Sequence, residues 1–235
     1  MTVTRIPQTP LKIPPLESGD RLSRPEFERR YKAMPQSTQA ELLEGKVFMA
    51  SPLRAQAHGK PHARMMGWLI AYEAATPGVE VLDNPTVRLD ADNEPQPDAV
   101  LRIENGGKST ISEDDYLEGA PELIIEIAAS SASLDLGTKL QVYQRNQVHE
   151  YLVWRVYDGE FDWFELQSNQ YIQLAADSRD ILRSRIYPGL WLDRGALLNG
   201  DLATVLATLQ QGLASPEHQA YVQKEIDRAS STEDP

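Results

Sequence analysis

Hydrophobic positions along the chain follow helical spacing in some segments and strand spacing in others. From Pro61 onward, Met65, Trp68, Leu69 and Tyr72 recur at helical spacing until a Pro-Gly pair at 77–78 interrupts the pattern, which predicts an amphipathic helix. Residues 122–128 are apolar and β-branched over several positions, as expected of a central strand that is covered on both faces. The polar interruption within that run is Glu126.

Shorter patterns predict the remaining elements. Ser23 followed by Pro25 and Glu26 indicates a short helix that ends near Met34. Residues 40–50 predict two short strands joined by a tight turn at Glu44-Gly45. Further strands are expected at 79–82, 86–89 and 99–103, and three antiparallel strands at 150–157, 161–166 and 171–174. A helix carrying Leu136, Leu140 and Tyr143 follows residue 130, two more span 196–213 and 216–228, and 104–120 reads as a loop.

This order of elements indicates an α/β or α+β fold with a mixed central sheet flanked by helices. We expect an N-terminal arm and short helix over residues 1–35, a single domain over 36–195, and a C-terminal helical extension over 196–235. The residues from 230 to the end are predicted to be disordered.

Composition narrows the classes of protein that this chain can represent. Of its 235 residues, 41% are hydrophobic and 25% are charged, which is ordinary for a folded domain with one core. Cysteine is absent, which excludes disulfides, thiolate zinc sites and cysteine nucleophiles. Neither an apolar run of about 20 residues nor a signal peptide is recognisable, so we expect no membrane association and a cytoplasmic location.

The chain is acidic, with 23 Lys and Arg against 35 Asp and Glu and a net charge of −12. Such a charge opposes loose association with nucleic acid, because the phosphate backbone dominates that affinity. A nuclease is not excluded, since a site built from metal-binding carboxylates is itself acidic and local basic clusters occur at residues 21–32 and 54–64.

Three residues beside apolar runs suggest a site that binds a divalent metal and activates a water molecule. Asp98 follows Pro97 just before the strand at 99–103, Glu126 lies within the central strand, and Lys139 falls early in the next helix. Two carboxylates suit Mg²⁺ or Mn²⁺, and a lysine can orient or deprotonate an attacking water. A Glu-x-Lys arrangement would place the lysine at position 128, where the chain has alanine, so Lys139 must fold back from the helix to reach Glu126.

The chain resembles the Uma family of endonuclease-like proteins, within the restriction-endonuclease-like PD-(D/E)xK superfamily. The segments that carry the resemblance lie between residues 40 and 195: AELLEGKV at 40–47, SP at 51–52, HG at 58–59, QPD at 96–98, GAPELIIE at 119–126, residues 135–143 and EYLVW at 150–154. No single segment is specific, but their order and spacing are.

The resemblance implies a restriction-endonuclease-like mixed sheet, with Asp98 and Glu126 as metal ligands and Lys139 in the role of the catalytic lysine. It also implies that Glu44, in the acidic-residue-glycine motif of the first hairpin, assists the site. The activity implied is a Mg²⁺- or Mn²⁺-dependent hydrolysis of DNA phosphodiester bonds, and a homodimer would suit a duplex with two strands to cut.

Each assignment has a structural alternative. Asp98 could cap a turn, Glu126 could simply pair with Lys139 or an arginine, Lys139 could face solvent, and Glu44 could be an ordinary turn residue. His58 and His62 have the i, i+4 spacing of a zinc pair, but Pro61 between them begins the helix and places His58 outside it. This favours a helix-start or phosphate-contact role over a zinc pair, and plain surface placement over either. At the level of the whole protein, the alternatives are a non-catalytic nucleic-acid or protein-binding module of the same fold, and a scaffold that oligomerises through residues 151–171.

Overall fold

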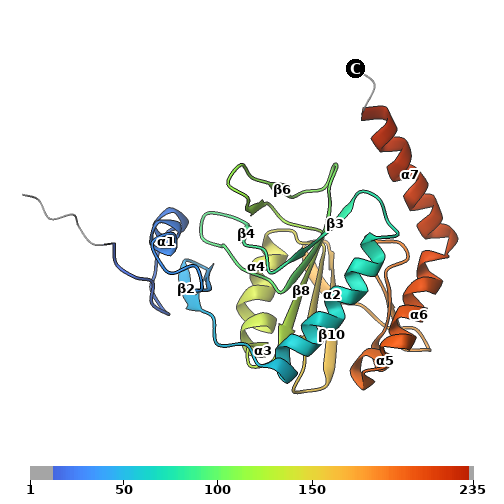
Figure 1. Ribbon diagram of the computed structural model, residues 1–235, viewed down its shortest axis with the longest axis horizontal. Coiled ribbons are helices and arrows are strands. Elements are labelled where there is room, and N and C mark those ends of the chain that lie inside the picture. The colour runs from blue at the N-terminus through green and yellow to red at the C-terminus, as the bar shows by residue number, and fades with distance from the viewer. Residues whose placement is uncertain (1–12, 233–235) are drawn as a thin grey trace, which may run out of the picture.

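A six-stranded mixed sheet forms the centre of the protein in the computed structural model, which describes residues 13–232 (Figure 1). Its strands lie in the order β11-β10-β9-β8-β5-β3. Strands β8 and β9 are parallel, whereas every other neighbouring pair is antiparallel. The strands are β3 (Val79–Asp83), β5 (Ala99–Ile103), β8 (Leu123–Ala128), β9 (Glu150–Arg155), β10 (Glu160–Gln167) and β11 (Gln170–Gln173). The predicted mixed sheet and its three consecutive antiparallel strands are therefore confirmed.

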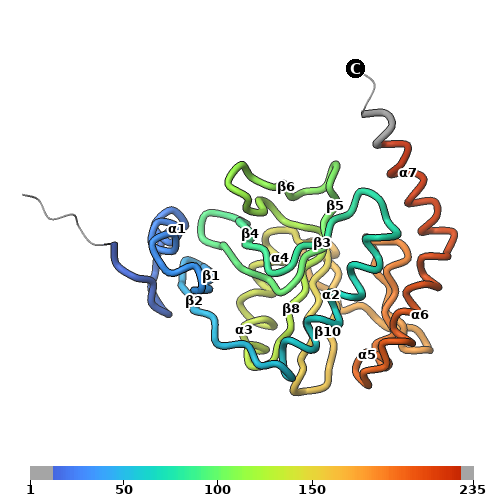
Figure 2. The backbone as a smooth tube through the Cα atoms, viewed as in Figure 1, coloured from blue at the N-terminus to red at the C-terminus, as the bar shows by residue number. Residues whose placement is uncertain are grey.

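Helices cover both faces of this sheet (Figures 1 and 2). On one face, α2 (Lys60–Glu73), α5 (Arg194–Asn199) and α6 (Leu202–Leu213) contribute to a core with Ile125 and Ile127 of β8. On the other face, α4 (Leu140–Arg145) packs against Ile124 and Ala128. Because side chains alternate along a strand, Glu126 belongs to the face that α4 covers.

The N-terminal part forms a smaller unit beside the sheet (Figure 2). It has its own apolar cluster around Phe27 and Leu42. It consists of α1 (Arg24–Tyr31), β1 (Ala40–Leu43) and β2 (Lys46–Met49). The turn between the two strands has positive φ at Glu44 (52°) and Gly45 (66°), which fits the two-residue hairpin that the sequence predicted. Two backbone hydrogen bonds between Leu42 and Glu94 attach the hairpin to the segment that leads into Asp98.

Several elements differ from the sequence-based expectation. The segment 104–120 contains two short strands, β6 (Thr110–Ile111) and β7 (Leu117–Glu118), which form a separate sheet with β4 (Val87–Arg88). Strands β12 (Ile181–Arg183) and β13 (Trp191–Asp193) were not predicted, because runs of three residues carry too little periodicity to be recognised.

The ends of the chain are only partly open to comparison. Helix α7 (Pro216–Thr232) continues through residues 230–232, which were expected to be disordered. Residues 1–12 of the predicted arm and residues 233–235 lie outside the described part of the chain. Within residues 13–232, none of the helices has the length and apolar composition that crossing a bilayer requires.

Candidate functional site

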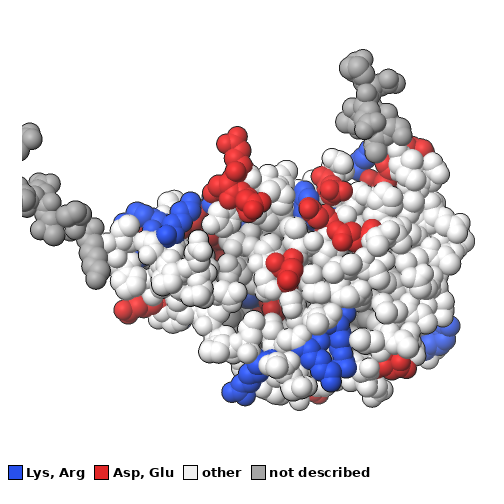
Figure 3. Space-filling view, in the orientation of Figure 1, with Lys and Arg blue, Asp and Glu red and all other residues white. Residues whose placement is uncertain are grey.

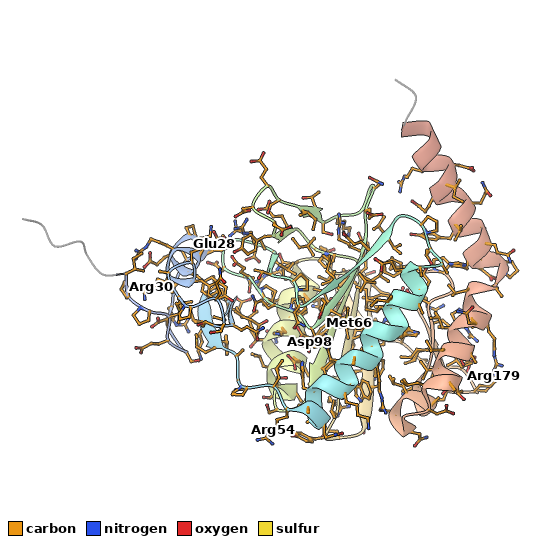
Figure 4. All side chains as sticks on the ribbon, viewed as in Figure 1. Glu28, Arg30, Arg54, Met66, Asp98 and Arg179 are labelled. Carbon is orange, nitrogen blue, oxygen red and sulfur yellow. The ribbon has the colours of Figure 1, made fainter. Side chains whose placement is uncertain are left out.

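A cleft of about 650 Å³ opens at the carboxyl ends of the parallel strands β8 and β9, where the N-terminal hairpin meets the central sheet. Its floor carries four carboxylates and one ammonium group, contributed by Glu41, Asp98, Glu126, Asp135 and Lys139. Figure 4 shows Asp98 near the centre of the molecule and Arg54, which also lines the cleft, at its lower edge.

Local structure fixes the two predicted metal ligands. Asp98 stands immediately before β5, and its Oδ2 atom accepts a hydrogen bond of 2.6 Å from the backbone amide of Ile127 in the neighbouring strand. Glu126 is almost completely buried within β8, at 4% exposure. The two carboxylates therefore lie on adjacent strands and line one cleft.

Lys139 reaches this site from the helical segment after β8, as the sequence argument required. Its Nζ atom lies 2.9 Å from Glu126 Oε1 and 2.8 Å from Glu41 Oε1, and 3.9 Å from Asp135 Oδ1. Asp98, Glu126 and Lys139 are thus brought together, although they come from three separate elements. The alternative of a solvent-facing lysine does not fit, because Lys139 is only 4% exposed.

Two π-helical turns border the site. Lys139 and Asp135 lie in η2 (Asp135–Lys139), which joins α3 (Ala132–Leu134) to α4, and His58 lies in η1 (Ala55–Gly59), just before α2. Such turns widen the helix by one residue and occur often at functional sites. The side chains of His58, Asp135 and Lys139 all line the cleft.

The electrostatics of the cluster follow from burial. Burial raises the pKa of the Glu126 carboxyl well above its ordinary value, against the opposing charge of Lys139. Burial also raises the pKa of Asp135 to about 6. By itself, burial would lower the pKa of Lys139, but the surrounding carboxylates raise it well above the ordinary value. The lysine therefore keeps its proton, and the excess of carboxylates favours uptake of a further positive charge.

Tyr143 supports Glu126 from the side of α4. Its hydroxyl donates a hydrogen bond of 2.9 Å to Glu126 Oε1, the same oxygen that contacts Lys139. Burial raises the pKa of Tyr143 well above its usual range, so the hydroxyl stays protonated and remains a donor. The sequence indicated Tyr143 only as one of the regularly spaced positions of the helix after residue 130.

Glu44 does not join the site, and Glu41 occupies the corresponding place. Glu44 lies at the exposed tip of the hairpin, where its Oε1 atom is 2.7 Å from Arg145 Nη1. Glu41 contacts Lys139 and also accepts a hydrogen bond of 2.7 Å from the backbone amide of Gln96. The alternation of β1 was the signal that could have identified it, because Ala40 and Leu42 face the apolar cluster and Glu41 must face away from it.

His58 was expected at the surface, but it is 8% exposed and lines the cleft. Its Nε2 atom lies 3.1 Å from Asp98 Oδ1, and this carboxylate raises the pKa of the imidazole. His62 instead contacts the backbone oxygen of Asp98 and the carboxylate of Asp83. The two rings stack at 5.7 Å between centroids, and their Nε2 atoms face different oxygen atoms of Asp98 and Asp83 rather than a shared zinc position.

The donor set suits a hard divalent cation in part. Both hydrogen bonds that Glu126 accepts fall on Oε1, and none from the described residues falls on Oε2. Asp98 uses Oδ2 for the amide of Ile127 and directs Oδ1 toward His58. Within residues 13–232, no three His, Cys, Asp or Glu side chains are arranged to hold a metal ion. The two carboxylates therefore fit a cation such as Mg²⁺ only if backbone oxygens or waters complete its shell, as is usual for this ion.

Comparison with known proteins gives consistent results. A family model described as "Uma2: Putative restriction endonuclease" matches residues 24–195. The crystal structure of a "putative nuclease belonging to DUF820" from Anabaena variabilis ATCC 29413 superposes with a TM-score of 0.53 at 11% sequence identity, covering 77% of this chain and 97% of the other. At that identity the likeness establishes the restriction-endonuclease-like fold alone. A search among curated proteins found no match.

Proposed function

The chain belongs to the Uma2 family, and from this premise we propose that its cleft hydrolyses phosphodiester bonds of DNA with the help of Mg²⁺ or Mn²⁺. The observation that supports this proposal most directly is the convergence of Asp98, Glu126 and Lys139 in one cleft. Two carboxylates beside a buried ammonium group are the side chains that such a hydrolysis needs.

In this proposal, Asp98 and Glu126 would hold the cation, since one oxygen of each carboxylate accepts no hydrogen bond from the backbone or from Tyr143. When bound, a divalent cation supplies charge neutralisation at the phosphate and a lower pKa for a coordinated water. Lys139 orients the attacking water and stabilises negative charge on the phosphate. It acts as a donor rather than as a base, because its neighbours raise its pKa well above the ordinary value.

In this proposal, Glu41 takes the assisting role that the family resemblance implied for Glu44. Its carboxylate lies 2.8 Å from the Lys139 ammonium and is itself held by the amide of Gln96. We propose that Glu41 fixes the position of Lys139, because a long flexible side chain needs more than one partner to keep a single orientation. Glu44 is engaged with Arg145 and is too exposed for this role.

The proposal is tested by incubating the purified protein with DNA in the presence of Mg²⁺ or Mn²⁺. Asp98→Asn and Lys139→Met should each abolish cutting. Two matched controls should cut as the wild type does: Asp115→Asn, which removes a carboxylate from the loop between β6 and β7, and Lys224→Met on α7. Cutting that persists in the Asp98 or Lys139 variant would refute the assignment.

A second function is favoured by one observation. The Lys139 ammonium lies between Glu41, Glu126 and Asp135 and neutralises part of their charge without any cation. A protein that had exchanged metal binding for an internal ion pair would serve as a nucleic-acid or protein-binding module of the same fold. Isothermal calorimetry discriminates the two, because the module would bind neither Mg²⁺ nor Mn²⁺.

A further inference from the structure

The two most exposed large hydrophobic side chains among the described residues lie at the rim of the same cleft. Leu53 is 62% exposed and Tyr157 is 61% exposed, whereas the other exposed large hydrophobic side chains reach at most 50%. Both residues line the cleft that holds the carboxylate cluster. A single exposed hydrophobic residue is ordinary on a protein surface, but the meeting of the two most exposed ones at one opening indicates an apolar contact for a ligand.

The two residues come from distant segments. Leu53 belongs to the linker between β2 and η1, and Tyr157 belongs to the turn between β9 and β10. A hydrogen bond of 3.0 Å from the amide of Val156 to the carbonyl of Ala128 holds that turn against the end of β8. Tyr157 is therefore carried on a fixed support next to the carboxyl ends of the two strands that border the site.

Arg54 adds a positive charge beside these two side chains. It follows Leu53, lines the cleft and is exposed, and its guanidinium makes no ion pair or hydrogen bond with any residue in the described part of the chain. Most arginines between residues 13 and 232 are instead paired with carboxylates, as Arg88, Arg102 and Arg155 are. Figure 3 shows Lys and Arg side chains gathered at the lower edge of the molecule, where α2 begins, and Figure 4 places Arg54 at this edge.

We propose that this rim binds unpaired nucleotides of DNA, with one base stacked on Tyr157, the neighbouring nucleotide packed against Leu53, and a phosphate paired with Arg54. The proposal rests on the proposed function, since it names the form of DNA that the same cleft takes. Binding to a duplex draws its affinity from many phosphate contacts, which a chain of net charge −12 is poorly equipped to make. Stacking of bases on an aromatic side chain does not depend on charge.

Fluorescence polarisation of the full chain with a labelled single strand of about 12 nucleotides tests this binding, because such a strand spans the usual length of a single-strand groove. Phosphorothioate linkages keep the probe intact in Mg²⁺, so binding is measured whether or not the protein cuts DNA. The same strand annealed to its complement serves as the duplex probe.

We expect the single strand to bind more tightly than the duplex. Tyr157→Ala should weaken single-strand binding about 5- to 150-fold, and Tyr157→Phe should restore it because the ring is retained. Arg54→Ala should weaken binding and reduce the slope of log affinity against log salt by about 0.7, the value for one phosphate contact. Ile172→Ala on β11 and Arg179→Ala, which Figure 4 places far from Asp98, are matched controls that should bind as the wild type does.

Tighter binding of the duplex than of the single strand would overturn the proposal. A Tyr157→Ala variant that binds the single strand within about twofold of the wild type would also overturn it, because loss of one stacked base weakens binding by more than that. This result is separable from the proposed function, which fails if unmodified DNA is not cut in Mg²⁺ or Mn²⁺. If the wild type does not cut DNA but binds the single strand in a Tyr157-dependent way, the proposed function fails and the proposed single-strand binding stands.

Discussion

Replacing Lys139 by methionine removes the positive charge at the centre of the carboxylate cluster and keeps most of the side chain's length. The Lys139 side chain is 5% exposed, and its ammonium lies 2.8 Å from Glu41 and 2.9 Å from Glu126. Removing one member of such a buried ion pair leaves its partner uncompensated, which typically costs about 3–5 kcal/mol. We therefore expect the free energy of unfolding to fall by about that amount near neutral pH.

The loss of stability in Lys139→Met should be larger at higher pH. The charge of Lys139 lowers the pKa of Glu126, so its removal raises that pKa further above the unfolded value. A carboxyl whose pKa is higher in the folded protein stabilises the fold below its unfolded pKa, and this contribution is lost as the pH rises through the folded pKa. The Lys139→Met variant should therefore lose more stability at about pH 8 than at about pH 5.

Urea unfolding measured at both pH values checks this reasoning, with Lys224→Met on the exposed surface of α7 as the control. The double variant Glu126→Gln/Lys139→Met should be destabilised by at least about 1 kcal/mol less than the sum of the single variants, because the two residues interact directly. If the free energy of unfolding of Lys139→Met stays within about 0.5 kcal/mol of the wild-type value at both pH values, the lysine does not stabilise the carboxylate cluster.

Three further predictions follow from particular contacts. Burial raises the pKa of Glu150 to about 7, so the contribution of this carboxyl to the free energy of unfolding should fall by roughly 2.5 kcal/mol as the pH rises from about 5 to about 8. Urea titrations of Glu150→Gln should show a correspondingly flatter dependence of stability on pH, and an equally steep one would contradict this. Trp68 is 1% exposed and donates a hydrogen bond to the carbonyl of Trp191. Trp68→Ala should therefore lower the free energy of unfolding by about 3–5 kcal/mol. A thermal midpoint that did not fall would contradict this. Glu41→Gln should slow DNA cutting about 10- to 100-fold while Glu44→Gln cuts normally, and equal rates would remove Glu41 from the site.

Much of the site was readable from the chain itself. The apolar run at 122–128 specified a buried central strand, and strand alternation put Glu126 on the face of Ile124 and Ala128, where α4 now packs. Alanine at position 128 showed that the lysine had to come from elsewhere, and Lys139 was the next lysine along the chain. These features are local, because spacing along a strand or helix determines which face a side chain occupies.

What the tertiary structure decided is which distant segments meet. Glu41 rather than Glu44 contacts Lys139 because the N-terminal hairpin attaches to the segment before Asp98, and its register turns Glu41 toward the cleft. His58 is buried beside Asp98 because a π-helical turn precedes α2. Leu53 and Tyr157, 104 positions apart in the sequence, reach one rim only through packing of the linker and the β9–β10 turn. No local period encodes such meetings, since they depend on how separately formed elements pack together.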